Sequence, residues 1–191
     1  MNESEILEYF KQTGAILKGH FKLSSGLHSD TYLQCAKLLS HPQIAEILCA
    51  EVAKKINIKV DLVVAPAMGG VVVGYEMARQ LGLPGIFCER VDGIFELRRG
   101  FEIEKGAKVL IVEDVVTTAK SSLEAVECVK KYGGEVVAEA CLVDRGEGAK
   151  NLPFPLFSLL KLNVPTYDPA NLPDHLKGTE AVKPGSRYLT K

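Results

Sequence analysis

The stretch VLIVEDVVTTAKSS, Val109 to Ser122, decides the fold class of this chain. It opens with a continuous apolar run, which is typical of a strand buried on both faces. Two adjacent carboxylates, Glu113 and Asp114, come next, and a turn of small and hydroxyl residues follows them. Apolar residues within 123–129 then recur at helical spacing until Gly133-Gly134 interrupts the pattern. The stretch therefore predicts a strand, a turn and an amphipathic helix in succession.

The same alternation continues on both sides of this stretch. Leu62–Ala65, Ile86–Cys88 and Val136–Val143 are short apolar runs that predict further strands. A helical segment lies between the first two of these runs and ends near Gly82. Alternating strands and helices are typical of a mostly parallel sheet covered on both faces. We therefore expect an α/β fold, a mostly parallel twisted sheet flanked by helices.

The N-terminal segment has a different pattern. Asn2 and Glu5 have the spacing of a capping box, so we expect a helix that Gly14 stops. A second helix is expected to start near Ser40–Pro42, and Leu23–Asp30 between the two helices is expected to be irregular. We predict one domain with a core of about residues 40–162, a small N-terminal hood of about 1–39 and a peripheral C-terminal flap of about 163–191.

Composition excludes several classes of protein. The chain has 191 residues, 47% hydrophobic and 25% charged, as in an ordinary globular protein. A formal net charge of -1 provides no basic field for nucleic acid or an anionic membrane, so neither is expected as a partner. No apolar stretch approaches the ~20 residues that a membrane span requires. No basic region precedes a hydrophobic block at the N-terminus, so no signal peptide is expected.

Cysteine usage indicates a reducing compartment. The five cysteines are odd in number, widely spaced and form no CxxC pair. This pattern favours neither a zinc site nor a disulfide framework. We therefore expect a cytoplasmic protein.

The turn after Glu113 and Asp114 has the chemistry of a phosphate site. A loop that enters a helix offers unpaired N–H groups and the positive end of the helix dipole. Thr117, Thr118 and Ser121 add hydroxyl donors. Carboxylates beside a phosphate are useful where they accept hydrogen bonds from sugar hydroxyls or offset positive charge on a ribose. The alternative is an acid that only caps the next helix.

The segment resembles the phosphoribosyl pyrophosphate (PRPP) signature of type I phosphoribosyltransferases. The resemblance implies that fold, and a PRPP site that includes Glu113, Asp114, Val115, Val116, Thr117, Thr118, Ala119, Lys120 and Ser121. The family usually has glycine near Ala119 and Lys120, so we expect the loop backbone here to differ slightly. PRPP would also contact Met68 and Gly69, because PAMGG at 66–70 resembles the pyrophosphate loop of the family.

Further segments are similar to orotate phosphoribosyltransferases. Gly19–Asp30 followed by Tyr32 resembles the base-site segment, and Leu142–Gly148 resembles the segment whose arginine meets the orotate carboxylate. The residues implied to bind orotate are Thr117, Arg145, Ser24 and Tyr32. An arginine suits a carboxylate because its guanidinium can form a fork of two hydrogen bonds. Alternatively, Arg145 is a surface ion-pair partner and Tyr32 belongs to the core.

This chain departs most from the family pattern in the segment that corresponds to the mobile loop of the family. This segment is Glu89–Ile103, where Arg90 stands at the arginine position but the usual lysines and histidine are absent. Arg98 and Arg99 offer replacement positive charge for PRPP, although they could instead be a solvated pair in a hairpin. The resemblance implies catalytic roles for Asp114, Glu113 and Arg90, with the loop closing over the site.

The resemblance implies the reaction of orotate and PRPP to give orotidine 5′-monophosphate and pyrophosphate, a step of pyrimidine (UMP) biosynthesis. It also implies Mg²⁺ held mainly by PRPP rather than by protein side chains, and a homodimer in which the loop reaches the neighbouring site. Two alternatives stay open, a purine phosphoribosyltransferase and a non-catalytic PRPP- or nucleotide-sensing regulator of the same fold.

Overall fold

The structure is a computed structural model that describes residues 1–23, 25–146 and 148–183. Ser24 and most of the Lys183–Arg187 segment, whose role the sequence leaves open, lie outside the described residues. Among the described residues, no helix combines the length and the apolar character that a membrane crossing requires.

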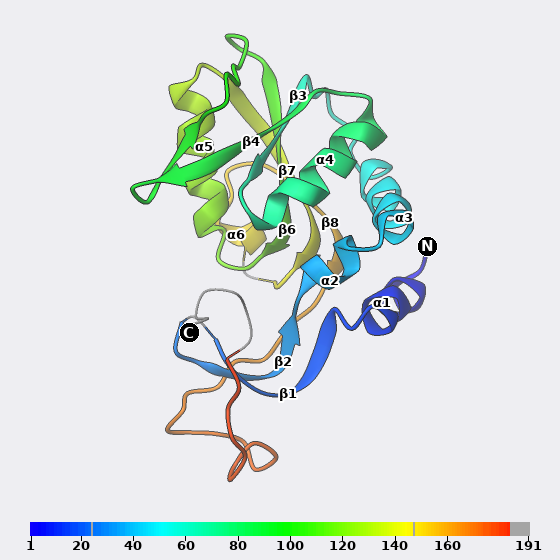
Figure 1. Cartoon of the computed structure of the whole chain (residues 1–191), viewed down its shortest axis with the longest axis vertical. Coiled ribbons are helices and arrows are strands. Elements are labelled where there is room, and N and C mark those ends of the chain that lie inside the picture. Colours follow the sequence, from blue (N-terminus) through cyan, green and yellow to red (C-terminus); the bar gives the residue numbers. More distant parts are fainter. Residues whose placement is uncertain (24, 147, 184–191) are drawn as a thin grey trace.

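The described residues form a central six-stranded sheet in the order β5-β4-β3-β6-β7-β8 (Figure 1). All neighbouring strands are parallel except the β4–β5 pair, which is antiparallel. The bounds are β3 Leu62–Pro66, β4 Gly85–Val91, β5 Ile94–Leu97, β6 Lys108–Val116, β7 Glu135–Asp144 and β8 Leu156–Lys161.

Helices cover both faces of this sheet (Figure 1). The helices are α1 Glu3–Gln12, α2 Cys35–Leu39, α3 Pro42–Ala53, α4 Gly69–Leu81, α5 Lys120–Lys131 and the short α6 Gly148–Asn151. Leu48 of α3 and Val73 of α4 share a core cluster with Leu110 of β6. Val126 of α5 and Ile111 of β6 belong to a separate cluster on the opposite face. The expected α/β class is confirmed.

The central strand β6 shows why its sequence is a continuous apolar run. The side chains of Val109, Leu110, Ile111 and Val112 have no exposed surface. Successive side chains of a strand point to opposite faces, and here both faces are covered. Neither face therefore has a place for a polar side chain until the strand reaches Glu113.

The segment predicted to form the hood, about residues 1–39, contains a two-stranded antiparallel sheet of β1 Ile16–Lys22 and β2 His28–Leu33, here called the hood sheet, which lies at one end of the molecule (Figure 1). The expected irregular stretch Leu23–Asp30 is therefore wrong from His28 onward. The buried residues of β2, Ser29 and Thr31, are polar. The strand therefore lacks the alternation of hydrophobic and polar residues that predicts a strand.

The C-terminal segment is joined to the hood. Backbone bridges link Phe21 to Val182 and His28 to Tyr167. The buried Ser29 hydroxyl also donates to the Pro165 carbonyl at 2.8 Å. The C-terminal segment is thus bonded to both strands of the hood sheet.

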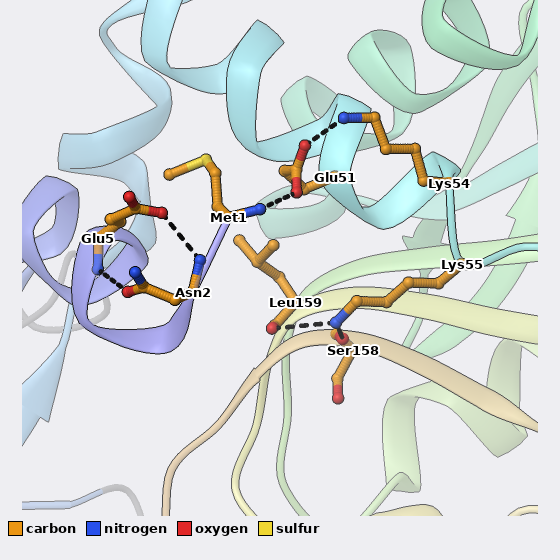
Figure 2. Close-up of polar contacts among 8 residues, drawn as sticks. All are labelled: Met1, Asn2, Glu5, Glu51, Lys54, Lys55, Ser158 and Leu159. Carbon is orange, nitrogen blue, oxygen red and sulfur yellow. Dashed lines mark hydrogen bonds and ion pairs between the residues drawn. The ribbon is translucent and has the colours of Figure 1, made fainter.

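Figure 2 shows polar contacts that cap α1, that join the N-terminus to α3 and that join the end of α3 to β8. The predicted capping box is confirmed, since the Asn2 side chain accepts from the Glu5 N–H and the Glu5 carboxylate accepts from the Asn2 N–H. The Met1 amine pairs with Glu51 of α3 at 2.6 Å. Lys55, just beyond α3, donates to the Ser158 carbonyl of β8 at 2.6 Å (Figure 2).

Candidate active site

The two acids of the central strand lie on opposite faces of the sheet. The expectation that β6 ends at these acids is wrong, because β6 continues to Val116 and both acids lie within it. Glu113 is 9% exposed, and the charge of Glu139 on β7 helps to raise its pKa. Asp114 lies on the side of Gly69 and Tyr32. Strand alternation therefore separates two side chains that are adjacent in sequence.

Burial controls the charge of both acids. The pKa of Glu113 is raised to about 9, mainly by burial and further by Asp114 and Glu139. Burial also raises the pKa of Asp114, and a 2.9 Å hydrogen bond from the Val115 N–H opposes this rise. A buried carboxyl favours its neutral form until a cation or hydrogen-bond donors arrive. Hydrogen-bond donors from a ligand would therefore stabilise the charged form of both carboxyl groups.

The loop between β6 and α5 forms a small depression of about 120 Å³. Its lining residues are Glu113, Val115, Val116, Thr117, Thr118, Ala119, Lys120, Ser121 and Ser122. α5 begins without a side-chain cap, so the N–H groups of its first turn are left for other acceptors. A depression at a helix N-terminus with these donors fits a phosphate group.

Ala119 shows which conformation the loop backbone adopts. It is the N-cap of α5 with φ +61°, in the left-handed region that glycine adopts most easily. An L-residue other than glycine pays about 1 kcal/mol or more for this conformation. The loop therefore keeps a glycine-like backbone although its sequence has alanine.

The pyrophosphate-loop segment packs closely against the acids. A Cβ added at Gly69 would lie 3.0 Å from Asp114 Oδ1, and one added at Gly70 would lie 2.8 Å from the Val112 carbonyl. The Ala67-Met68 peptide bond is cis, and the Met68 side chain is 83% exposed. The N-terminus of α4 thus meets the same end of β6 as the phosphate depression. A side chain at Gly70 would collide with the Val112 carbonyl, and one at Gly69 would press against the Asp114 carboxylate.

Arg145 follows β7 directly and is attached to the phosphate loop. Its backbone N–H donates to the Val116 carbonyl at 2.9 Å. Its guanidinium is half-buried, makes a long 3.4 Å bond to the Val164 carbonyl, and has its pKa lowered by burial. Among the residues that the structure describes, this is the one hydrogen bond of the guanidinium, so most of its five N–H donors are available to a ligand.

The segment predicted to be a mobile loop contains a β-hairpin, with Arg90 in its first strand and Arg98 and Arg99 directly after its second strand. Within Glu89–Ile103, the residues to Val91 extend β4, and β5 occupies Ile94–Leu97. The turn between them is Asp92-Gly93, with φ +50° and +87°. This Asp-Gly turn is a strong hairpin signal that the sequence already contains.

Contacts within the protein hold Arg90 of the hairpin and Arg99 after it in place. Arg90 donates to the Gly93 carbonyl at 2.6 Å, pairs with Glu124 of α5 and lies 4.1 Å above the Phe95 ring. Arg99 pairs with Glu89 at 3.2 Å, and Arg98 precedes it in the turn after β5. In this state Arg90 and Arg99 bind the protein itself.

Tyr32 brings the hood to the site. It lies on β2, with its ring centroid 5.7 Å from that of Phe21. Burial raises its pKa, and the nearby Asp114 charge raises it further. The structure thus brings Tyr32, Asp114 and Gly69 together, whereas Ser24 lies outside the described residues.

Sequence reasoning missed one polar pair beneath the phosphate loop. Ser122 Oγ donates to Glu139 Oε1 at 2.7 Å, and the two side chains are 2% and 0% exposed. The available signal was a single acid within the apolar run Val136–Val143. An acid in a strand buried on both faces needs a partner, because burial of an unpaired charge is costly.

Comparison with known proteins agrees with this arrangement. Residues 35–170 match the family model of the phosphoribosyl transferase domain. An adenine phosphoribosyltransferase from Rhodothermus marinus shares the fold, with a TM-score of 0.66 and 23% identity over 84% of this chain and 100% of that chain. Fold, loop order and family match define a phosphoribosyltransferase, a pentosyl-transferring enzyme.

Two other relatives narrow the class. The orotate phosphoribosyltransferase of Sphingopyxis alaskensis is 54% identical over 99% of both chains. The crystal structure of orotate phosphoribosyltransferase from Aeropyrum pernix matches with a TM-score of 0.69 and 25% identity, over 82% of this chain and 93% of that chain. The chain belongs to the orotate phosphoribosyltransferase family.

Proposed function

We propose that this protein transfers the ribose 5-phosphate of PRPP to orotate, giving orotidine 5′-monophosphate and pyrophosphate for UMP biosynthesis. The observation that carries the proposal is the attachment of Arg145 to the phosphate loop through the Val116 carbonyl. This bond holds a carboxylate-binding side chain beside a phosphate depression. The names of the relatives support the same pair of substrates.

In this proposal the phosphate loop binds the 5-phosphate of PRPP. The N–H groups of residues 118–121 and the hydroxyls of Thr117, Thr118 and Ser121 supply the donors, and the N-terminus of α5 supplies a favourable dipole. Lys120 adds a positive charge at the first residue of α5. The backbone at Val115 and Val116 connects this loop to the acids of β6.

Asp114 and Glu113 act on the ribose. Their carboxylates accept hydrogen bonds from the ribose hydroxyls and stabilise positive charge that develops on the ring as the bond from C1 to pyrophosphate breaks. Both acids lie beside the pyrophosphate loop, Asp114 at Gly69 and Glu113 at Gly70. Met68 and Gly69 contribute backbone groups to the pyrophosphate.

Arg145 selects the base through its carboxylate. Its guanidinium is half-buried and retains free donors, so it can form two parallel hydrogen bonds to the orotate carboxylate. Thr117 adds a hydroxyl at the start of the loop, and Tyr32 closes the site from the hood. Ser24 belongs to the same proposed set.

The hairpin arginines act on the departing pyrophosphate. Arg90 would exchange Glu124 for the pyrophosphate, with Arg98 and Arg99 adding positive charge from the turn after β5. Because Glu96 anchors β5 to α5, the parts that would close over the site are the Asp92-Gly93 turn and the residues after β5. Their closure would exclude water from a reactive ribose.

Mg²⁺ fits the donors present. Within the described residues, no group of three or more His, Cys, Asp or Glu side chains is placed to hold a metal ion. An ion would therefore take most of its oxygens from PRPP and water, as Mg²⁺ does in phosphate sites. Bound Mg²⁺ supplies charge neutralisation of the pyrophosphate.

A homodimer is supported by exposed apolar side chains on α4 and the hairpin. Met68, Val72 and Tyr75 lie at helical spacing and are 83%, 52% and 73% exposed, and Ile94 beside the hairpin turn is 66% exposed. Burial of these side chains would favour association of two copies. In such a dimer the hairpin would reach the neighbouring site.

The cytoplasm is the proposed compartment. All five cysteines are free and buried, which fits a reducing environment. No bound nucleic acid or membrane is part of the proposal, because the net charge of -1 provides no field for either.

One assay tests the proposed reaction. Purified protein with PRPP and Mg²⁺ should consume orotate, measured by loss of orotate absorbance, and should leave adenine, hypoxanthine, xanthine and uracil unchanged. Faster consumption of a purine would favour the purine alternative. PRPP binding without turnover of any base would favour a regulator.

A further inference from the structure

The buried Ser122–Glu139 pair connects the proposed phosphate site to the neighbouring strand. Ser122 is the third residue of α5, within the helical turn whose free N–H groups line the depression. Glu139 lies in the middle of β7, in register with Ile111 of β6. The 2.7 Å bond between them is thus a side-chain contact between the first turn of α5 and the sheet.

Other devices that fix a helix start are weak here. The N-cap is Ala119, which makes no side-chain hydrogen bond and has a left-handed backbone. A serine or aspartate at that position would have fixed the first turn by capping it. Capping would also occupy an N–H group that a phosphate needs. A bond from the buried side of the helix holds the turn and leaves the N–H groups open.

Glu139 has the properties of a dedicated acceptor. Its side chain is fully buried, and its second oxygen, Oε2, has no hydrogen-bond partner among the residues that the structure describes. Burial raises its pKa to about 7, and the Ser122 hydrogen bond opposes this rise. A carboxyl that is easily neutral can accept from Ser122 without presenting a full negative charge to a bound phosphate.

We propose that Glu139 is a positioning residue that holds the first turn of α5, through Ser122, in the geometry that binds the 5-phosphate of PRPP. The inference rests on the proposed function, since it assigns PRPP to this loop. Glu139 acts through Ser122 and does not touch the substrate. Loss of the pair loosens the phosphate site and leaves the orotate side, which Arg145 holds from β7, in place.

Three variants of the pair test this role. Ser122→Ala and Glu139→Ala should each weaken PRPP binding about tenfold. This is the scale of the loss of one hydrogen bond, whether Glu139 accepts it as a neutral or as a charged group. Glu139→Gln should restore affinity to within about threefold, because its amide oxygen can accept from Ser122. The double variant Ser122→Ala/Glu139→Ala should be no weaker than either single one, since both remove the same bond.

A matched control removes a contact at the opposite end of the same helix. Glu96 of β5 accepts from Lys131 at 2.6 Å and from the Tyr132 hydroxyl at 2.8 Å, at the C-terminal end of α5. Glu96→Gln should lower the melting temperature without changing PRPP affinity. This variant separates general loosening of α5 from loss of geometry at its first turn.

PRPP affinity is measured by calorimetry with Mg²⁺ on the full chain, alongside melting temperature and the KM values of both substrates. Selective loss of PRPP affinity with an unchanged orotate KM and rescue by Glu139→Gln supports the proposal. Unchanged PRPP affinity in Ser122→Ala, or equal loss in Glu96→Gln, overturns it. If Glu139→Ala does not fold, Ser122→Ala and Glu139→Gln still decide the outcome. Calorimetry needs no base, so failure of this inference is distinguishable from a wrong base; unmodified protein that binds no PRPP would instead reject the proposed function.

Discussion

The backbone N–H of Arg145 donates a 2.9 Å hydrogen bond to the carbonyl of Val116, the residue before the phosphate loop. β7 and β6 are parallel neighbours, with Asp144 opposite Val116, so this bond extends their pairing by one step beyond β7. The carboxyl ends of both strands meet at one edge of the sheet, where ligands of open α/β folds bind. The same register thereby sets the distance between the proposed base-binding and phosphate-binding groups.

Arg145→Ala should raise the KM for orotate about ten- to a hundredfold and leave PRPP affinity largely unchanged. A charge-assisted pair with a carboxylate contributes roughly 1.5–3 kcal/mol, and each 1.4 kcal/mol is tenfold. Arg145→Lys should recover only part of the loss, because an ammonium cannot fork onto two oxygens. Steady-state kinetics with each substrate varied is the measurement. Loss of PRPP binding with intact orotate affinity would place Arg145 on the pyrophosphate side.

The two acids should differ in their response to neutral replacements. Asp114→Asn should lower kcat/KM by about 10²–10³-fold, the scale of one preorganised electrostatic contact. Glu113→Gln should cost about tenfold or less, because the pKa of about 9 leaves Glu113 mostly neutral in the free enzyme near pH 7. Kinetics and melting curves of both variants check this order. Equal losses would mean that strand alternation does not divide their roles.

Ala119→Gly should leave folding stability within about 1 kcal/mol of the unmodified protein. Relief of the left-handed backbone gains about 1–2 kcal/mol. Loss of one buried methyl costs about 0.8 kcal/mol, and greater freedom of the unfolded chain costs about 0.4–1 kcal/mol. Ala119→Val should destabilise the protein and weaken PRPP binding, since a β-branched residue fits this conformation poorly. Denaturant unfolding of both variants is the measurement, and a valine variant as stable as the glycine variant would contradict the backbone argument.

The strands and helices that the sequence predicts correctly carry a strong apolar signal. The core of β6 is such a case, because both of its faces are covered and its sequence is uniformly apolar. β2 of the hood was missed, since its inward positions Ser29 and Thr31 are hydroxyl residues that make hydrogen bonds instead of apolar contacts. The periodicity of hydrophobic residues carries no information about such a strand.

The candidate site divides in a similar way. Contiguous groups, such as the loop at residues 117–121, follow from local sequence because a strand, a turn and a helix bring them together. The Ser122–Glu139 pair could not be predicted, because it depends on the register between strands β6 and β7 and on the rotation of α5 over them. The ion pair between Arg90 and Glu124 depends in the same way on how the hairpin packs against α5.

The stability of the protein should fall as pH rises from about 5 to 9. Burial raises the pKa of Glu139 to about 7 and that of Glu113 to about 9, and Cys141 beside Glu139 is held neutral by the same burial. An unfolded glutamate has a pKa near 4.3. The native state therefore holds protons that the unfolded state has released, and the free energy of unfolding decreases through this window.

Glu139→Gln isolates one part of this dependence. Each pH unit over which a group keeps its extra proton changes the free energy of unfolding by about 1.4 kcal/mol. The variant should therefore lose the part of the slope that Glu139 contributes between about pH 5 and 7. It should keep a part from Glu113 that ends below pH 9, because the charge of Glu139 no longer raises the pKa of Glu113. Glu96→Gln is the opposite control, because hydrogen bonds from Lys131 and Tyr132 lower the pKa of Glu96. The Glu96 contribution is present above its ordinary pKa and is lost as pH falls, so that variant should be destabilised near neutral pH and approach the unmodified protein in acid. Urea unfolding at a series of pH values measures all three proteins. A Glu139→Gln profile that runs parallel to that of the unmodified protein would show that Glu139 is ionised in the native state throughout, and that its hydrogen bond with Ser122 is a bond to a full negative charge.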